Sequence, residues 1–470
     1  MKNRKLILLV FLIWGFQLTY AVNLKLPSII GSHMVLQQKS SVAIWGWAKA
    51  GTVVTIKPGW MANASQATVN SDGTWKIKLI TPEAGGPFEI SIKSDTTIIL
   101  KDILIGEVWV CSGQSNMEMP VAGNPSQPVN GSIDYIAHGN NKNIRLFTVK
   151  QAISAKPLNN CGGEWNVSSS SNVANFSAVA YFFGQYLQET LGIPVGLIST
   201  SWGGTPVQSW TDDITMTNEF KEFDLSALNT EQIFEPSTPT VLFNSMIHPL
   251  LNFTIRGAIW YQGEANISNP DQYTKLFPAM IRGWRKLWNQ GEFPFYYVQI
   301  APFKYSPEIN SSFLRESQLK TMQTIPNTGM AVTMDIGEYE CIHPAEKIPV
   351  GKRLAYWALA KTYGMDGLSY SGPIYKEMEV NKNKAILVFD YAENGLSSFG
   401  KELKGFVIAG DDKQFYPAKA VISENSLEVW SDDVKNPVAV RYCWENYAVG
   451  TLFNTAGLPA SSFRSDHWEK

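Results

Sequence analysis

The sequence predicts an α/β protein in which one parallel-sheet domain is flanked by two all-β domains. Its length of 470 residues is too great for one ordinary core. The middle of the chain alternates strand-like apolar runs with helix-like stretches, whereas both flanks contain only short alternating runs separated by turn residues. We therefore expect a β-sandwich over residues 22–104, an α/β domain over 105–365 and a second β-sandwich over 366–470.

The first 21 residues have the features of a secretory signal peptide. Lys2, Arg4 and Lys5 precede the apolar run 6–14, and small residues stand at positions −3 and −1 of a cut after Ala21. The apolar run is too short to span a bilayer comfortably, and no later segment is long enough. We expect removal of residues 1–21 and a periplasmic or secreted protein without an integral membrane segment.

The two flanking regions show the pattern of short β-strands. In the first, runs such as SVAIWGWA (41–48) and WKIKLI (75–80) are separated by turn signals that include Asn-Ser-Asp-Gly (70–73), and no helical period appears. The second returns to the same pattern, with five short β runs between residues 385 and 444. Each region is therefore predicted to form a β-sandwich.

The middle of the chain has the strand–helix–strand order of a parallel sheet. Five apolar runs are predicted to be strands: 103–110, 195–202, 257–262, 293–300 and 329–334. Helical spacing of apolar residues predicts helices over Val173–Glu189, Tyr273–Trp288 and Ser312–Thr324. Sites in such sheets lie at the carboxyl ends of the strands. The loops that follow strands are therefore the place to seek a function.

Charge and cysteine content exclude several classes of function. A net charge of −2 without a basic stripe argues against nucleic acid or an anionic membrane as the main partner. The four cysteines are widely spaced with no CxxC pair, and no histidine–carboxylate spacing resembles a metal site. We expect no metal and no cofactor, and at least two free, buried cysteines. The sequence leaves the oligomeric state open.

Four loops that follow predicted strands carry unusual polar groups. They are Gly113–Asn116, Ser199–Pro206, Trp260–Asn266 and Asp335–Pro344. Nucleophilic acyl transfer needs a hydroxyl, a base, a group that orients the base, and donors for the oxyanion. Ser115 can supply the hydroxyl. Among the five histidines, only His343 follows an α/β strand within a cluster of acids, so we expect it to be the base.

The same loops offer donors for an oxyanion. Glycines allow a backbone N–H to approach a ligand closely, so Gly203 or Gly204 can join the N–H of Ser115. The side-chain amide of Gln262 or Asn266 can add another donor. Each of these residues also has an ordinary structural role in a turn or at a strand end. Their occurrence in order, at successive strand ends of one α/β unit, favours the catalytic interpretation.

At this point the motifs resemble a known family. The sialate O-acetylesterase family of carbohydrate esterases, within the wider SGNH (GDSL-like) hydrolases, is similar to this chain at residues 106–120, 198–210, 257–266 and 342–359. Residues 26–38 and 450–468 also look like that family, so the resemblance covers nearly the whole chain after the signal segment. It implies an SGNH-hydrolase-like catalytic domain between the two β-sandwiches.

The resemblance also implies roles for individual residues. Ser115 matches the family nucleophile and His343 the general base. Gly203 or Gly204 and Gln262 match the oxyanion-hole positions. Four further residues are predicted to hold the pocket or contact substrate: Gln114, Asn116, Glu264 and Arg315.

The chain departs from the family at one position. The family has an aspartate two residues before the histidine, and Cys341 stands there in this sequence. Relatives in the superfamily have the aspartate three residues before the histidine, where this chain has Glu340. We expect Glu340 to be the third catalytic residue. The alternatives are Asp335, Glu338, or a serine–histidine dyad without a carboxylate.

The predicted function is a secreted serine esterase that removes O-acetyl groups from a sugar or glycan. The sequence is compatible with two substrate classes: O-acetylated sialic acid, and acetylated plant polysaccharides such as xylan or xyloglucan. The rival hypothesis is a carbohydrate-binding protein with a decayed esterase site, since β-sandwiches and many aromatic residues suit sugar binding. The retention of Ser115, His343, Gln262 and both glycines argues against decay.

Overall fold

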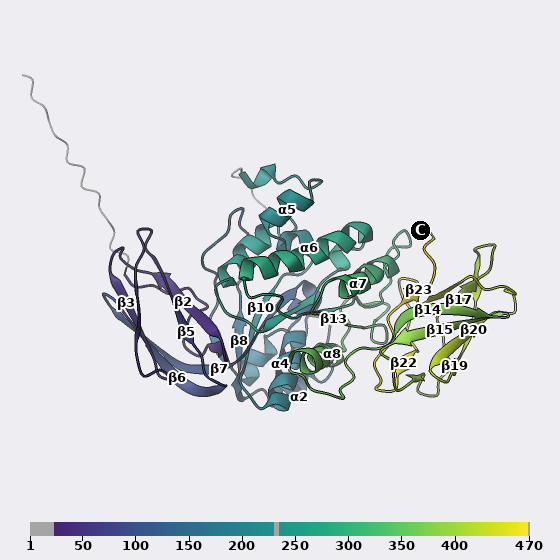
Figure 1. The fold of residues 1–470 in the computed structure, drawn as a ribbon, viewed down its shortest axis with the longest axis horizontal. Coiled ribbons are helices and arrows are strands. Elements are labelled where there is room, and N and C mark those ends of the chain that lie inside the picture. The colour runs from purple at the N-terminus through teal and green to yellow at the C-terminus, as the bar shows by residue number, and fades with distance from the viewer. Residues whose placement is uncertain (1–22, 230–234, 469–470) are drawn as a thin grey trace, which may run out of the picture.

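The computed structural model describes residues 23–229 and 235–468. The predicted signal segment and its cleavage site lie outside these residues. Three regions follow one another along the longest axis of the molecule, with the α/β domain between the two β domains (Figure 1). No helix in the described part of the chain has the length and apolar character needed to cross a membrane.

The α/β domain is built on a sheet whose strands lie in the order β13-β12-β11-β7-β10-β8-β9. All neighbours are parallel except β8 and β9, which are antiparallel. The prediction of a mostly parallel central sheet is confirmed. The strands are β7 (Thr97–Gly113), β8 (Asn141–Thr148), β9 (Trp165–Ser168), β10 (Val195–Ser201), β11 (Gly257–Tyr261), β12 (Phe295–Val298) and β13 (Thr328–Ala331).

Helices cover both faces of this sheet. Successive side chains of a strand point to opposite faces, and β7 shows this, since Trp109 packs into the core that includes α4 and α8 whereas Val110 packs into the core that includes α6. The α-helices are α1 (Ser115–Glu118), α2 (Ser132–Ala137), α3 (Ser170–Ala174), α4 (Ala178–Leu191), α5 (Asp213–Glu219), α6 (Pro270–Trp288), α7 (Ser312–Thr324) and α8 (Lys347–Trp357). Short 3-10 or π turns lie at Val207–Trp210, Ser226–Asn229, Phe243–Ile247, His248–Leu250, Glu264–Asn266 and Ala358–Thr362.

Two of the three predicted helices agree closely with the structure. The bounds of α7 are those predicted, and α6 begins three residues earlier because Pro270 is well suited to the first turn of a helix. The predicted helix Val173–Glu189 is instead two helices, α3 and α4. The break falls at Ser177, whose hydroxyl accepts the N–H of Ala180 and caps the second helix.

The N-terminal domain shares a strand with the central sheet. Its strands are β1 (Val35–Gln37), β2 (Ser41–Trp47), β3 (Val53–Pro58), β4 (Ser65–Thr68), β5 (Thr74–Ile80) and β6 (Gly85–Lys93). Strands β2 and β5 form one antiparallel sheet, while β3, β4, β6 and β1 form a second sheet with the first half of β7. The second half of β7 pairs with β10 and β11. The predicted boundary at 104/105 therefore falls inside one continuous strand.

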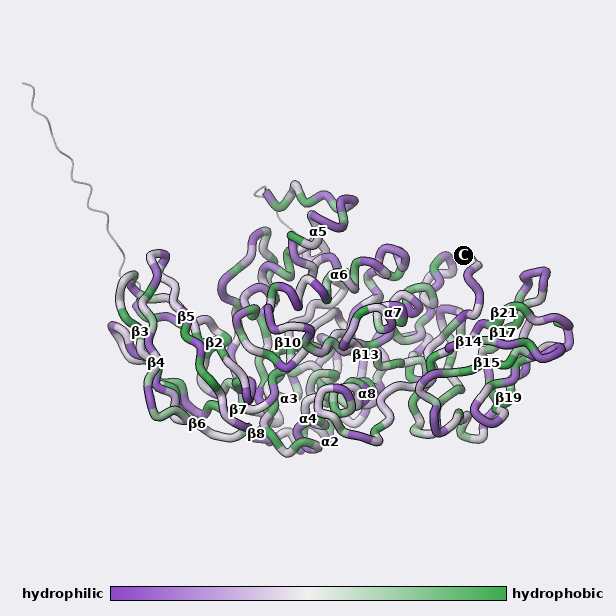
Figure 2. The backbone as a smooth tube through the Cα atoms, in the orientation of Figure 1, coloured by the Kyte–Doolittle hydropathy of each residue, from purple (hydrophilic) through white to green (hydrophobic). Residues whose placement is uncertain are grey.

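The C-terminal domain consists mainly of two four-stranded antiparallel sheets. In Figure 2 the hydrophobic segments follow strands such as β15 and β17, and the loops between them are hydrophilic. The strands are β14 (Ile374–Asn381), β15 (Lys384–Asp390), β16 (Leu396–Ser397), β17 (Phe406–Ala409), β18 (Phe415–Pro417), β19 (Lys419–Ser423), β20 (Ser426–Trp430), β21 (Ala439–Tyr442), β22 (Phe453–Asn454) and β23 (Phe463–Arg464). All four cysteines are free and three are buried, as predicted.

Candidate active site

The turn after β7 presents Ser115. Gly113 has a φ of +143°, and a Cβ at this position would lie 2.1 Å from the carbonyl oxygen of Tyr261, so only glycine lets the chain pass this close to β11. The next N–H, that of Gln114, donates to the same carbonyl. Ser115 is then the first residue of α1, at the carboxyl end of the central strand.

Ser115 and His343 are in contact. The serine Oγ lies 2.8 Å from the histidine Nε2, although the two residues are 228 positions apart. Burial lowers the pKa of His343 below 6.5, and the positive charge of Lys347 lowers it further. The ring is therefore neutral at pH 7, and its Nε2 can accept the serine proton.

Glu340 does not reach His343, contrary to the prediction. Its carboxylate pairs with Lys304 and its side chain is 72% exposed. The loop between β13 and α8 turns this side chain towards solvent. The histidine Nδ1 instead lies 3.0 Å from Oε1 of Gln127.

The two alternative carboxylates of the same loop are also engaged elsewhere. Asp335 forms two hydrogen bonds with the guanidinium of Arg353, at 2.8 and 2.6 Å. Glu338 accepts the N–H of Ala345 at 2.7 Å. The three acids considered from the sequence therefore serve the shape of the loop. Cys341, at the position of the family aspartate, has its thiol 3.3 Å from the carbonyl oxygen of His343.

Sequence reasoning missed Gln127. It lies in the loop between α1 and α2, away from the strand ends, and a neutral amide is not the usual partner of a catalytic histidine. The signal in the sequence is the proline-rich stretch Asn124–Pro128, which indicates a rigid turn.

The predicted oxyanion donors are partly engaged. The N–H of Gly203 donates to Oε2 of Glu118 at 2.5 Å, and Gln151 donates to Oε1 of the same carboxylate. Gly204 is exposed, and an added Cβ would meet nothing within 4 Å. The N–H of Ser115 belongs to the first turn of α1, where an amide has no acceptor within its own helix.

The side chain of Gln262 lies outside the site, contrary to the prediction. It is fully buried, and its Nε2 donates to the carbonyl oxygen of Thr205 and to Oδ1 of Asn266. Both amide protons are therefore used within the loops. The amide of Asn266 is engaged in part, since its Oδ1 also accepts the N–H of Val207 and its Nδ2 donates one hydrogen bond to Gln208.

Gln114 holds two loops together. Only 3% of it is exposed, and its Oε1 accepts the N–H groups of Gly263 and Ala265. Its oxygen therefore has a structural role, and the predicted contact with substrate stays a prediction. Gln114 fastens the turn after β11 to the turn that presents the serine.

Asn116 and Glu264 form a buried polar cluster beneath the Ser115–His343 pair. The Asn116 amide donates to Glu264 and to the carbonyl oxygen of Ile342, and its oxygen accepts from Lys347. Burial raises the pKa of Glu264, and burial lowers the pKa of Lys347 to about 7. These side chains tie the serine turn to the loop of His343, and their predicted contact with substrate stays a prediction.

Arg315 has a different position from the one predicted, since it does not line a pocket. It is fully buried in α7, and its guanidinium joins that helix to the C-terminal domain. Its hydrogen-bond acceptors are the hydroxyls of Ser311, Ser312 and Ser462 and the carbonyl oxygens of Cys443 and Glu445.

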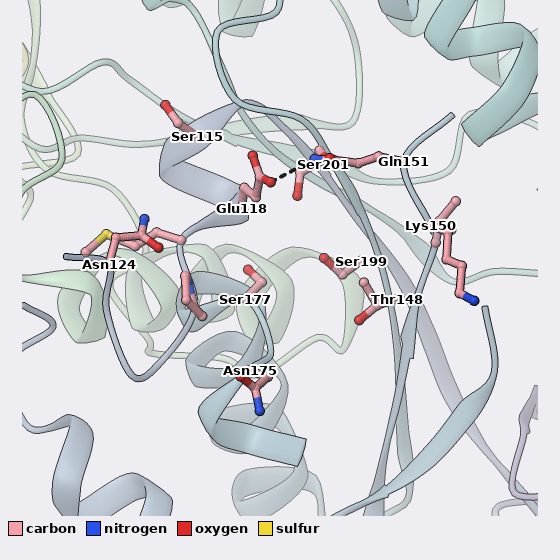
Figure 3. A pocket seen from close by; sticks show the side chains of 13 residues that line it. Ser115, Glu118, Asn124, Thr148, Lys150, Gln151, Asn175, Ser177, Ser199 and Ser201 are labelled. Carbon is pink, nitrogen blue, oxygen red and sulfur yellow. Dashed lines mark hydrogen bonds between the residues drawn. The ribbon is translucent and has the colours of Figure 1, made fainter. Parts of the chain in front are cut away.

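A cavity of about 580 Å³ opens beside Ser115. Ser115 and Glu118 border it from α1, and Ser199 and Ser201 border it from the end of β10 (Figure 3). This volume is in the range of small-molecule sites. Ten of the thirteen residues that line the cavity are polar or charged and none is aromatic, so the cavity offers no aromatic ring on which a sugar could stack.

A serine at a strand end, hydrogen-bonded to a neutral histidine beside a cavity, is the arrangement of a serine hydrolase. Residues 105–360 match the model of the family described as carbohydrate esterase, sialic acid-specific acetylesterase. The sialate O-acetylesterases of Homo sapiens and Pongo abelii are each 31% identical to this chain over 495 residues, which covers 94% of the chain and 92% of each relative. The chain belongs to this family and is a carboxylic ester hydrolase.

A solved structure agrees with this assignment. The crystal structure of a carbohydrate acetylesterase from Xanthomonas citri aligns with a TM-score of 0.86 and 35% sequence identity. The alignment covers 95% of this chain and 100% of that chain. The similarity therefore includes both β domains as well as the catalytic domain.

Proposed function

We propose that this protein removes O-acetyl groups from carbohydrates with Ser115 as nucleophile and His343 as general base. The observation that carries the proposal is the 2.8 Å contact between the serine Oγ and the histidine Nε2 at the carboxyl edge of a parallel sheet. The names of the similar proteins support an acetylated carbohydrate as substrate.

The reaction follows from this geometry. The serine Oγ attacks the acetyl carbonyl carbon while its proton passes to Nε2 of His343, and a tetrahedral oxyanion forms. The same nitrogen then gives the proton to the sugar oxygen as the carbon–oxygen bond of the ester breaks. Water, deprotonated by His343, then attacks the acetyl-serine, and His343 returns the proton to the serine Oγ as acetic acid leaves and ionises to acetate.

The N–H groups of Ser115 and Gly203 are the proposed donors for the oxyanion. Gly203 becomes available only when its present acceptor, the carboxylate of Glu118, moves away. The ester carbonyl would thus replace a carboxylate oxygen that already binds at this N–H. Donors aimed at the developing charge are the largest single source of rate enhancement in such reactions.

The proposed substrate is an acetylated sugar, either an O-acetylated sialic acid or an acetylated plant polysaccharide. The cavity carries one acidic side chain, Glu118, and one basic side chain, Lys150, so its charge favours neither substrate. The features of residues 1–21 support secretion into the periplasm or the medium.

Hydrolysis of p-nitrophenyl acetate by the wild type and by Ser115→Ala tests the proposal. We expect the variant to lose at least a thousandfold in kcat, since the nucleophile acts together with the base. Ser199→Ala is the matched control, because this buried serine borders the same cavity and forms no hydrogen bond with His343 that the structure records. Equal activity of the wild type and Ser115→Ala would refute the assignment of the nucleophile.

A panel of acetylated glycans follows for the wild type. Release of acetate from O-acetylated sialic acid, acetylxylan and acetylated xyloglucan distinguishes the two substrate classes. Release from none of them by an enzyme that hydrolyses p-nitrophenyl acetate would contradict the carbohydrate part of the proposal.

A further inference from the structure

The third residue at the Ser115–His343 pair is a neutral amide. Oε1 of Gln127 lies 3.0 Å from Nδ1 of His343, on the side of the ring opposite Ser115. In a serine hydrolase this position belongs to a carboxylate, which orients the histidine and stabilises the imidazolium that forms. An amide oxygen can orient the histidine, but it stabilises the imidazolium only weakly because the amide carries no net charge.

The turn that carries Gln127 is built to hold it in place. Asn124 and Gln127 exchange two backbone hydrogen bonds of 2.9 Å, which close a four-residue turn. Pro125 fixes the first central position, and Ser126 has a φ of +61°, as the second central position of a type II turn requires. Because main-chain atoms close the turn, it does not depend on the Gln127 side chain, which is free to serve the histidine.

Acceptance by Oε1 also selects the useful tautomer of His343. An amide oxygen accepts a hydrogen bond, so the ring proton sits on Nδ1 and the lone pair on Nε2 faces the serine hydroxyl. This is the tautomer that a general base needs.

The charged groups around His343 do not replace the missing carboxylate. Of the acids on its own loop, Asp335 pairs with Arg353, Glu338 accepts a backbone N–H, and Glu340 pairs with Lys304. From α8, the charge of Lys347 acts against protonation of the ring, and Glu264 lies behind Asn116. From α1, Glu118 binds Gly203 and Gln151.

We propose that Gln127 is the positioning residue of His343, a neutral amide in the place where related catalytic triads have a carboxylate. This inference rests on the proposed function, because Gln127 acts only through His343. Its consequence is a base that is less easily protonated than in a Ser-His-Asp triad. The enzyme then keeps its activity in mild acid and gives up part of the stabilisation of the imidazolium.

Two variants of Gln127 test the proposal by kinetics. Gln127→Met keeps the length of the side chain and removes the acceptor, and we expect about a tenfold lower kcat, the effect of one lost neutral hydrogen bond. KM should change much less. Gln127→Glu restores a carboxylate and should keep or raise kcat, while it moves the acid limb of the pH–rate profile to higher pH because a negative charge favours protonated histidine.

Ser126→Asp is the matched control. It adds the same charge one residue away, at an exposed position whose positive φ aspartate tolerates, and it has no contact with His343. We expect its acid limb to move much less than that of Gln127→Glu, since an exposed charge acts on the ring through water of high dielectric constant. Wild-type kcat for Gln127→Met, or an unmoved acid limb for Gln127→Glu, would overturn the proposal. An effect on KM alone would assign Gln127 to substrate binding instead.

A second measurement separates this inference from the proposed function. Histidine side chains labelled with ¹⁵N report the tautomer and the pKa of His343 by NMR, without any substrate, and His343→Asn identifies its signal among the five histidines. We expect a proton on Nδ1 in the wild type and a higher pKa in Gln127→Glu. If no ester is hydrolysed, the proposed function fails while these spectra still decide the role of Gln127. A proton on Nε2 would refute that role.

Discussion

The N-terminal domain joins the central sheet through a shared strand, whereas the C-terminal domain joins the α/β domain mainly through side chains. At the first joint, β7 changes neighbours: Leu104–Gly106 pair with β1, and Glu107–Gly113 pair with β10. The joint therefore consists largely of ladder hydrogen bonds, which most side-chain substitutions leave intact.

The second joint depends on a few buried polar side chains. Arg315 alone contributes hydrogen bonds to Ser462 and to two carbonyl oxygens of the C-terminal domain. Gln299 donates to Ser461, and Arg464 pairs with Glu316. A buried polar group that loses its partner keeps its desolvation penalty, so such a joint is sensitive to single substitutions.

The second joint also supports the candidate site. The loop that carries His343 contacts the C-terminal domain through the rings of Tyr339 and Tyr447, whose centroids are 5.1 Å apart. Just before that loop, the carbonyl oxygen of Met334 accepts the N–H of Gly450. Damage to this joint should therefore reduce activity, while damage to the first joint should act on stability.

The largest effect is expected for Arg315→Met. The variant leaves five neutral acceptors, three hydroxyls and two carbonyl oxygens, without their donor, and buried polar groups left unpaired should together cost about 3–5 kcal/mol in the free energy of unfolding. Urea unfolding measures the loss, and kcat should fall with it. Arg282→Met is the control, because Arg282 is 52% exposed in its pair with Glu219 and should cost less than about 1 kcal/mol. Equal losses of stability for the two variants would show that the buried contacts of Arg315 contribute no more than an exposed ion pair.

A smaller loss is expected at the first joint for Gly106→Ala. A Cβ on Gly106 would lie 2.1 Å from the carbonyl oxygen of Pro194, so the main chain has to shift, at a cost of about 1–3 kcal/mol. Thermal unfolding measures it. Gly85→Ala is the control, since its Cβ would meet nothing within 4 Å. A fall in kcat that accompanies the loss of stability would contradict the expectation that damage to the first joint affects stability and not activity.

The smallest effect concerns the pair of Glu316 with Arg464. Burial raises the pKa of Glu316, but hydrogen bonds from Arg464 and Lys320 outweigh it and hold the pKa below 4.5. Because the carboxyl pKa is lower in the folded than in the unfolded state, the ionised group stabilises the fold above pH 4.5. This contribution is lost as the pH falls through the pKa of the folded state. We expect it to be about 1 kcal/mol, less than the losses above because Glu316→Gln keeps an acceptor for the largely buried Arg464. Unfolding of wild type and Glu316→Gln at pH 7 and in acid measures it: the difference between them should shrink in acid, and a constant difference would exclude the ionic contribution.

The sequence predicted those parts of the molecule that periodicity and topology determine. Parallel strands bring their carboxyl ends to one edge, so Ser115 and His343 could be paired from positions 228 residues apart. The 3.6-residue period predicted α7 to the residue. The predicted boundary after residue 104 was placed inside a strand, because a strand that serves two sheets shows the same apolar run as two successive strands.

The rest of the site depends on the directions of side chains, which local patterns do not encode. Glu340 and Gln262 stand at suitable positions in the sequence, yet one turns towards Lys304 and solvent and the other into a buried amide network. Arg315 matches a family position, but three of its five acceptors, those on Cys443, Glu445 and Ser462, come from 128 to 147 residues away. Gln127 shows the converse, since no strand-end signal points to it and only the folded turn brings it to the histidine.

The two halves of β7 also differ in the order in which their partner strands are synthesised. Strands β1 and β6 precede β7 in the chain, so its first half can pair as soon as it leaves the ribosome. Strands β10 and β11 follow only from residues 195 and 257, so the second half, with Trp109 and Val110, waits as an unpaired apolar edge. Unpaired apolar edges are where nascent chains aggregate. We expect this short stretch, which leads directly to Ser115, to be where a chaperone engages the nascent chain.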